Sequence, residues 1–465
     1  MESSSKLNKK DVEDIIGLSP MQEGILFHYL LSPETEQYFE QYSFSLAGDI
    51  SLPVFEKAWN YVVETNEMLR TVYRWKNLDK PVQIILKSRQ VIVKYEDISV
   101  LESEEKERVK NNFKVEDKKQ GFDLEDGPLF RVYLLKTGYS QYEMIVSNHH
   151  ILFDGWSYML LLKDFFKAYN HFLTGTELET LKKTKFKDYL KWLGTLVKSS
   201  EEIFWKEYLK GYKNQALLPL DDIKKRNMVT AKNIICKLNK DLTCRLKSFA
   251  VGWEVTLGTV FTAAWGLLLQ KYNSTNDVVF GTTVSGRSNT EMEGIQNIVG
   301  LMINTVPVRV CCSKNEKVGE MLQKISKNTN ERQSYEATPL IDIISYIDLD
   351  KRQSLFDSII VIENYPFEEL RRSGTGLKIT GYQGYGVTNY DLALAITWYD
   401  EIEINFIYNS DVFEEVTIEL LKERYIVLLE NMSENKENYC NDMEFLIEEE
   451  KKLLIRDEVF FDYCL

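Results

Sequence analysis

Several residue types are scarce in this chain, and each scarcity limits what the protein can do. Its 465 residues include only four histidines and nine prolines. The six cysteines stand at positions 236, 244, 311, 312, 440 and 464, and no two have the C-x-x-C spacing of a redox or zinc motif. With so few histidines available as further ligands, we expect no metal site. We interpret the cysteines as reduced thiols of a cytoplasmic protein.

Positive charge and long apolar runs are also lacking. The chain carries 57 lysines and arginines against 71 acidic residues, which gives a formal net charge of −14. Nucleic-acid binding requires a basic surface that neutralises phosphates, so we do not expect it here. The most apolar stretch, residues 257–269, is too short to span a bilayer, and no signal-peptide core precedes it. We therefore expect a soluble protein without a membrane partner.

The chain does contain enough apolar material for large cores, with 44% hydrophobic and 12% aromatic residues. A chain of this length predicts two or three domains. Strand patterns at 132–135, 143–147, 278–284, 305–310, 358–362 and 402–408 alternate with helical patterns at 156–172, 256–272, 317–332 and 414–432. A further helix is predicted over residues 54–75. The fold class is therefore α/β.

Two of the four histidines stand together in the run His149-His150-Ile151-Leu152-Phe153-Asp154-Gly155. A strand pattern precedes this run and a helical pattern follows it, so the histidines lie on a strand-to-helix connection. Loops anchored at both ends commonly carry reacting side chains, because the scaffold fixes their geometry. Asp154 can cap the following helix, and Gly155 allows a tight backbone turn. Without further matches, a buried histidine pair beside an ordinary helix cap explains the run about equally well.

Adjacent side chains on an extended segment point to opposite sides. The two imidazoles therefore cannot both face one reacting atom. One of the pair is expected to be structural.

The motif resembles the active-site signature of the condensation domains of non-ribosomal peptide synthetases, in the superfamily of chloramphenicol acetyltransferase. Other segments resemble motifs of that family in the family's order. These are residues 18–28, 68–73, 122–124, 127–131, 277–287, 298–309, 388–392 and 408–413. The ordered matches run through most of the chain.

The resemblance implies two chloramphenicol acetyltransferase-like lobes that form a V with a central tunnel. We place the N-terminal lobe at 18–180 and the C-terminal lobe at 181–465. The lysine-rich stretch 174–187 is a candidate connection between them. Residues 7–16 have the pattern of a short amphipathic helix and resemble an acceptor docking segment, so residues 1–17 are assigned to a possible docking helix.

The resemblance also implies roles for individual residues. We group His149, His150 and Gly155 as the catalytic candidates: His150 acts as a base or as a hydrogen-bond anchor, and we favour both roles together, while His149 supports the loop and Gly155 lies near the oxyanion. Asp154 and Arg70 are expected to form a buried ion pair that holds the loop. Ser285 and Asn389 are candidates for lining the channel.

The reaction that the resemblance implies is peptide-bond formation, in which an acyl or peptidyl thioester on an upstream carrier is joined to the amine of an aminoacyl thioester on a downstream carrier. The expected partners are upstream and downstream peptidyl carrier proteins, with an adenylation domain adjacent or in trans, since residues 442–454 resemble the segment that leads into one. We expect no cofactor of the chain's own, because the substrates arrive on the 4′-phosphopantetheine of the carriers. We expect a monomer. Residues 18–28 also resemble domains that follow an epimerisation module and accept a D-configured donor.

Related classes differ from this chain at identifiable places. An epimerisation domain needs an EGHGR-like segment, which is not found between residues 340 and 394. A heterocyclisation domain has aspartates in place of the histidines, and plant acyltransferases carry a DFGWG segment that is missing here. The remaining alternative is a catalytically silent, condensation-like platform that recruits other proteins. The intact His150, Asp154 and Gly155 argue against it.

Overall fold

The computed structural model describes residues 7–31, 38–178, 183–213, 218, 231–288, 292–313, 315–347, 354–363, 376–386, 388–398, 401–434 and 438–453. The chain divides into two compact units. The first unit comprises Met1–Leu196, Ser285–Ile303 and Tyr365–Thr388, and the second comprises Val197–Val284, Asn304–Asn364 and Asn389–Leu465. The segments Ser285–Ile303 and Tyr365–Thr388 therefore belong to the same unit as the N-terminal part of the chain.

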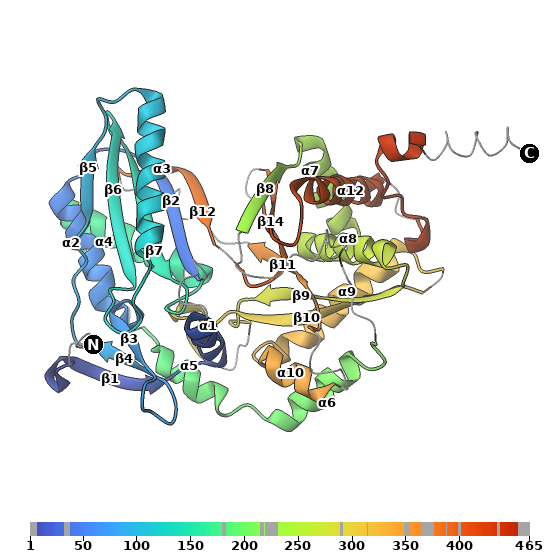
Figure 1. Cartoon of the computed structure of the whole chain (residues 1–465), viewed down its shortest axis with the longest axis horizontal. Coiled ribbons are helices and arrows are strands. Elements are labelled where there is room, and N and C mark those ends of the chain that lie inside the picture. Colours follow the sequence, from blue (N-terminus) through green and yellow to red (C-terminus); the bar gives the residue numbers. More distant parts are fainter. Residues whose placement is uncertain are drawn as a thin grey trace, which may run out of the picture. The chain divides into compact units, whose positions relative to one another are not determined.

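The first unit is built on a five-stranded sheet and a smaller three-stranded sheet (Figure 1). The larger sheet has the order β12 (Lys378–Tyr385), β2 (Phe39–Ala47), β7 (Gln141–His149), β6 (Phe130–Gly138), β5 (Lys94–Asp97). The smaller has the order β1 (Val12–Gly17), β4 (Val82–Leu86), β3 (Thr71–Arg74). Its helices are α1 (Pro20–Leu31), α2 (Leu52–Thr65), α3 (Ser103–Gln120), α4 (Gly155–Thr174) and α5 (Phe186–Leu193).

Alternation along β2 and β7 separates the two faces of the larger sheet. Phe44 lies on one face and packs on Tyr158 of α4, with ring centroids 5.8 Å apart. On the same side α2 packs against α4 through Trp59 and Phe165, whose ring centroids are 4.5 Å apart. Ile145 lies on the other face, in a cluster that includes Phe113 of α3. Helices thus cover both faces, and strand β7 runs between them to the histidine pair.

The second unit has a six-stranded sheet in the order β10 (Asn304–Cys311), β9 (Asp277–Val284), β11 (Ser358–Glu363), β13 (Leu392–Trp398), β14 (Ile402–Asn409), β8 (Ala231–Lys237). Strands β9, β11 and β13 are parallel neighbours, and the other pairs are antiparallel. Its helices are α6 (Lys198–Tyr208), α7 (Lys240–Gly252), α8 (Leu257–Tyr272), α9 (Val318–Arg332), α10 (Leu340–Tyr346) and α12 (Glu415–Glu434).

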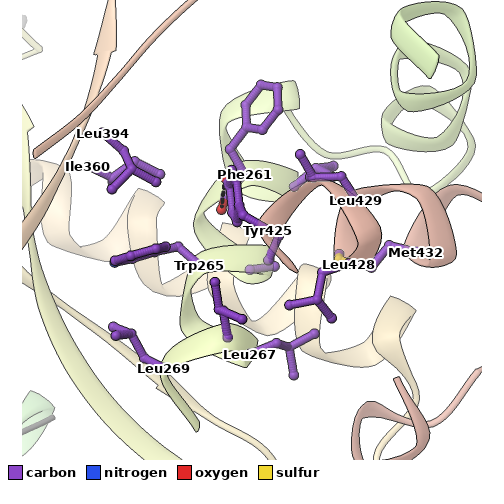
Figure 2. Close-up of a cluster of buried hydrophobic side chains, with 14 of the residues drawn as sticks. Phe261, Trp265, Leu267, Leu269, Ile360, Leu394, Tyr425, Leu428, Leu429 and Met432 are labelled. Carbon is purple, nitrogen blue, oxygen red and sulfur yellow. Dashed lines mark hydrogen bonds between the residues drawn. The ribbon is translucent and has the colours of Figure 1, made fainter. Parts of the chain in front are cut away.

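The main core of the second unit surrounds α8, which is buried over nearly its whole length. Figure 2 shows Trp265 of α8 among side chains from β11, β13 and α12. Tyr425 of α12 donates a hydrogen bond of 3.0 Å to the carbonyl of Phe261. Because the phenol is buried, this bond satisfies a group that would otherwise be costly to bury. Trp265 is fully buried in this core.

Periodicity located most of the long elements correctly. Strands β6, β7, β9, β10, β11 and β14 and helices α4, α8, α9 and α12 lie where the patterns predicted them. The helix predicted over residues 54–75 was wrong in its second half, because α2 ends at Thr65. The side-chain amide of Asn66 donates to the carbonyl of Val62 at 2.8 Å, and the chain continues through a 3-10 turn into β3.

The docking helix predicted over residues 1–17 was also wrong in its described part, residues 7–17. A 3-10 turn at Lys9–Asp11 leads directly into β1. The residues of β1 alternate between half-buried and exposed, and the strand pairs antiparallel with β4. Pairing with β4 therefore overrides the weak helical pattern of a segment too short to be stable as a helix alone. Residues 1–6 lie outside the described residues.

The boundary predicted near residue 180 differs from the observed division, because the first unit continues to Leu196. Three alternate lysines of the predicted connection bind acidic side chains of the first unit. Lys183 pairs with Asp164, and Lys187 pairs with Asp14 at 2.6 Å. Lys185 pairs with both Glu13 and Glu67, at 3.1 and 3.3 Å. The sequence suggested a solvated linker because of these lysines. Their ion pairs instead attach the segment to the first unit.

No single helix in the described ranges is long and apolar enough to cross a membrane. Among the described helices, α7 and α8 together have the length and apolar composition of a span, but they are bent by 101° relative to each other.

The core around α8 and α12 allows a direct test of this packing. Leu428 is fully buried, and we expect Leu428→Ala to lower the free energy of unfolding by about 2–5 kcal/mol, since the deletion leaves a cavity. Val416 on the same helix is 68% exposed, so Val416→Ala should change stability by less than about 0.5 kcal/mol. Urea unfolding of both variants measures the difference. Equal losses would contradict the assigned burial.

Candidate functional site

The two adjacent histidines at the end of β7 have different surroundings. His149 is the last residue of β7 and is 3% exposed. His150 follows it, and its side chain is 19% exposed. The amide of His150 donates to the carbonyl of Tyr38 at 2.8 Å, which continues the pairing of β7 with β2. Alternation along this extended segment therefore sends the two rings to opposite sides, as the sequence predicted.

Two acceptors hold one side of the His150 ring. Its Nδ1 lies 3.1 Å from the carbonyl oxygen of Phe153 and 3.2 Å from Oε1 of Glu40 on β2. A carbonyl and a carboxylate can only accept, so in the neutral ring Nδ1 carries the proton and donates. Nε2 then holds the lone pair, and it makes no hydrogen bond to any residue that the structure describes. A neutral His150 can therefore take up a proton at Nε2.

The electrostatic surroundings favour the protonated form of His150. Burial alone would lower the pKa of this imidazole. The charge and hydrogen bond of Glu40 oppose burial, with smaller contributions from Asp154 and the Phe153 carbonyl, and the pKa is raised above its ordinary value. Proton uptake at this ring is thus easier than in an exposed histidine.

Glu40 is a functional candidate that the sequence analysis missed. It is 9% exposed, and its carboxylate binds groups besides His150. The side-chain amide of Asn148 donates to Oε2 at 3.0 Å, and the hydroxyl of Tyr42 donates to Oε1 at 3.3 Å. No pattern near residue 40 indicated this role, because the contact depends on the pairing of two strands more than 100 residues apart.

The ring of His149 lies among aromatic side chains. Tyr29 meets it edge-on at 5.8 Å between centroids, and Phe122 does so at 6.5 Å. Its Nδ1 accepts a hydrogen bond of 3.2 Å from the amide of Ile151. Burial, with a smaller contribution from the charge of His150, lowers the pKa of His149 to about 3. A ring that stays neutral and holds the next loop amide suits the supporting role predicted for it.

Asp154 is fully buried and fixes the loop from its other end. As the N-cap of α4, its Oδ1 accepts from the amide and the hydroxyl of Ser157, both at 2.9 Å. Its Oδ2 accepts from Nη1 of Arg287 at 2.8 Å and from the amides of Met302 and Ile303 at 2.9 and 3.2 Å. Burial would raise the pKa of Asp154, but Arg287 and the amides outweigh it and hold the pKa below its ordinary value.

The predicted ion pair between Asp154 and Arg70 was wrong, since Arg287 is the partner of Asp154. Arg70 pairs instead with Glu13 of β1 at 2.8 Å. Its guanidinium also donates to the carbonyls of Val63 and Glu64 at the end of α2, at 3.1 and 3.3 Å. Free carbonyls at a helix C-terminus attract a cation, which explains why Arg70 is held there. Arg70 therefore supports α2 and not the histidine loop.

Gln22 is a second residue that the sequence analysis did not single out. It forms a capping box with Ser19: the backbone amide of Ser19 donates to Oε1 of Gln22 at 2.9 Å, and the backbone amide of Gln22 donates to Oγ of Ser19 at 3.2 Å. Its side-chain amide also donates to the carbonyl of Ile151 at 3.0 Å. The hydroxyl of Tyr73 donates to the same carbonyl at 3.0 Å. The spacing Ser-x-x-Gln was the available signal, although it indicates only a helix start.

The structure also locates Gly155, Ser285 and Asn389, the other candidate site residues. Gly155 is the first residue of α4. The hydroxyl oxygen of Ser285 accepts from the amide of Arg287 at 3.2 Å, so Ser285 shapes the turn that carries that arginine. Asn389 is an exposed residue of the second unit. The channel-lining role of Ser285 and Asn389 and the oxyanion role of Gly155 stay predictions. Among the described residues, no group of three or more His, Cys, Asp or Glu side chains could hold a metal ion.

The ion pair of Asp154 and Arg287 predicts a specific energetic coupling. Both side chains are at most 2% exposed, so Asp154→Asn should lower the free energy of unfolding by about 3–5 kcal/mol by leaving a buried cation unpaired. In a double-mutant cycle with Arg287→Gln the losses should be strongly non-additive. With Arg70→Ala they should add to within about 0.5 kcal/mol. Energetic coupling of Asp154 to Arg70, with none to Arg287, would contradict the observed ion pair and support the pair predicted from the sequence.

The lowered pKa of His149 predicts a loss of stability in mild acid. The unfolded chain binds a proton at this residue below its ordinary pKa of 6.5, while the folded ring stays neutral down to about 3. Proton binding therefore favours the unfolded state as the pH falls through this interval. The free energy of unfolding decreases by about 2 kcal/mol between pH 7 and pH 5. His149→Asn can keep the acceptor for Ile151 and should remove this part of the pH dependence. Urea unfolding at both pH values measures it, and an unchanged pH dependence in His149→Asn would contradict this assignment.

Comparison with known proteins identifies the family of this chain. A family model of the condensation domain matches residues 12–455. Tyrocidine synthase 2 of Brevibacillus parabrevis is 34% identical over 99% of this chain and 13% of its own length. Gramicidin S synthase 2 of Brevibacillus brevis is 33% identical over 97% of this chain and 10% of its own length. Surfactin synthase subunit 3 of Bacillus subtilis is 31% identical, with 97% and 35% covered. The chain thus spans 10–35% of the length of these relatives.

Solved structures show the same mixed α/β fold. The starter condensation domain of rhizomide synthetase superposes with a TM-score of 0.79 at 17% identity, covering 93% of this chain and 98% of that one. The first condensation domain of the calcium-dependent antibiotic synthetase gives 0.78 at 15% identity, with 94% and 100% covered. Because the family model extends over nearly the whole chain, this protein belongs to the condensation domain family.

Proposed function

We propose that this domain forms the peptide bond in non-ribosomal peptide synthesis. It would join an acyl or peptidyl thioester on an upstream carrier protein to the amine of an aminoacyl thioester on a downstream carrier. The observation that carries the proposal is the state of His150, whose Nδ1 is occupied by two acceptors while Nε2 is left with its lone pair. Membership of the condensation domain family favours this catalytic function over a silent recruitment platform.

The reaction needs little beyond placement and proton transfer, because a thioester is already activated. The amine nitrogen attacks the thioester carbonyl, and the carbonyl oxygen becomes an oxyanion. The C–S bond then breaks, the amide forms, and the donor arm leaves as a thiolate. The nitrogen gives up one proton in this sequence, and the thiolate requires one. His150 Nε2 can accept the first proton and return it to the sulfur, so the imidazole is unchanged at the end.

The histidine loop is also held in a fixed position, which would contribute to the rate in addition to the base. Holding two bound reactants in the correct geometry contributes a large part of the rate in reactions of this kind. In this domain Asp154 fixes the start of α4, Gln22 and Tyr73 hold the carbonyl of Ile151, and the Phe153 carbonyl accepts from the His150 ring. These contacts support a positioning role for the loop in addition to proton transfer.

The partners belong to the same proposal. The expected substrates are carrier-bound thioesters on 4′-phosphopantetheine arms, and an adenylation domain would load the downstream carrier. The crystal structure of a four-domain non-ribosomal peptide synthetase superposes on 96% of this chain, and the match covers 35% of that protein. That a domain of this fold occurs within a longer synthetase supports such neighbours here. A cytoplasmic location, a monomeric state and a donor with a D-configured last residue are further parts of the proposal.

Replacing His150 tests the proposal directly. We expect His150→Ala to reduce peptide-bond formation between two loaded carrier proteins by about 10²–10⁴-fold, the usual contribution of a positioned acid–base group. Mass spectrometry of the carrier-bound product, followed over time under single-turnover conditions, gives the rate.

The matched control is His171→Ala, which removes a histidine from the last turn of α4 and should leave the rate unchanged. Donors that end in an L- or a D-residue, run in parallel, test the donor class. An undiminished rate in His150→Ala with the wild-type fold retained would refute the catalytic role.

A further inference from the structure

We propose that Glu40 is the positioning residue of His150: its carboxylate fixes the tautomer of the imidazole and strengthens it as a base. The inference rests on the proposed function and deepens it, because it names a residue that decides which ring nitrogen receives the proton. Glu40 does not reach the reacting atoms through any contact described here. It acts on the reaction through His150.

Strand pairing brings Glu40 and His150 together. Glu40 pairs with Asn148 in the register of β2 and β7, and His150 follows Asn148 by two residues. Side chains two residues apart on an extended strand lie on the same face. The carboxylate of Glu40 and the ring of His150 therefore share one face of the sheet, and Oε1 reaches Nδ1 at 3.2 Å.

The carboxylate is itself held in place. Asn148 donates to Oε2 at 3.0 Å and Tyr42 donates to Oε1 at 3.3 Å, so neither oxygen is free to turn away. The ring of Tyr42 packs on Tyr158 of α4 with centroids 4.5 Å apart. An anchored, nearly buried carboxylate can therefore fix the orientation of a neighbouring ring. A mobile surface carboxylate cannot do so.

The other charged and titratable groups around His150 do not replace Glu40. Asp154 is already engaged by Arg287 and three N–H groups. His149 stays neutral, because its pKa is lowered to about 3. Tyr158 stays protonated, since burial and the charge of Glu40 both raise its pKa. Among the described residues, Glu40 is thus a nearby anion that no arginine or lysine pairs with, and its negative charge faces the imidazole.

Glu40 affects proton transfer in two ways. Its negative charge stabilises the imidazolium, so it raises the pKa of His150 and makes Nε2 more basic. As a second acceptor for Nδ1–H, it also disfavours the tautomer in which Nε2 carries the proton and cannot act as a base. The Phe153 carbonyl contributes to the second effect but brings no charge.

Glu143 provides a matched control on the neighbouring strand. It is 8% exposed, close to the 9% of Glu40, and lies on the opposite face of the sheet. Its carboxylate accepts from the hydroxyls of Ser43 and Ser45. The variant Glu143→Gln therefore removes an equally buried carboxylate from the same sheet and has no contact with His150.

The test uses imidazole NMR of the whole domain with labelled histidine. The chain has four histidines, so the His150 signals can be assigned by their loss in His150→Ala. In Glu40→Gln we expect the titration midpoint of His150 to move to lower pH and a larger share of its neutral ring to carry the proton on Nε2. Glu143→Gln should leave both properties unchanged. Glu40→Asp keeps the charge and should recover part of the midpoint, with thermal unfolding confirming that each variant is folded.

Kinetics give the second readout. In Glu40→Gln the acid limb of the pH–rate profile should follow the imidazole to lower pH, while the plateau of kcat falls roughly tenfold or more, within the ~10²–10⁴ contribution of a base. KM for the loaded acceptor carrier should change little. An unchanged His150 midpoint and tautomer in Glu40→Gln, or an equal change in Glu143→Gln, would overturn the proposal. Because the NMR result does not depend on turnover, failure of the catalytic function would appear separately, as full activity in His150→Ala.

Discussion

The buried carboxylate of Asp154 is the constraint on which the rest of the site depends. One oxygen caps α4, and the other binds Arg287 and two backbone amides from the segment Ser285–Ile303. A single side chain thereby joins the histidine loop to residues that lie 133 to 149 positions later in the sequence. Asp154 and Arg287 must be present together, because either charge left unpaired in this interior would be strongly destabilising. This explains why the later segment belongs to the first compact unit.

Given that fixed loop, the two histidines differ through their surroundings alone. His149 enters an aromatic cluster that offers no charge, so burial keeps it neutral and it serves as an acceptor for the loop. His150 meets a carboxylate and a carbonyl, which favour its protonated form and orient its neutral form. The two adjacent imidazoles thus lie on opposite faces of one sheet, and their surroundings lower the pKa of His149 and raise the pKa of His150.

Local patterns in the sequence predicted local structure well. The long helices and strands follow from apolar periodicity, and Asp154 was expected to cap α4 because Asp at such a position satisfies free backbone amides. The failures concern partners that are distant in sequence. Arg70 and Arg287 are equally plausible partners for Asp154 when only charge is considered. Residues 7–17 carry a helical pattern that pairing with β4 overrides. The lysines near residue 185 resemble a linker until their acidic partners are located.

The sequence by itself determined the α/β class, the family and the position of the histidine pair on a strand-to-helix loop, because each follows from local patterns and from their order along the chain. Only the tertiary structure decided that Arg287 neutralises Asp154, that Glu40 meets His150 and that Gln22 holds Ile151. The physical reason is that strand register and loop packing bring these groups together. One residue of slip in the pairing of β2 with β7 would turn Glu40 to the other face of the sheet and away from the imidazole.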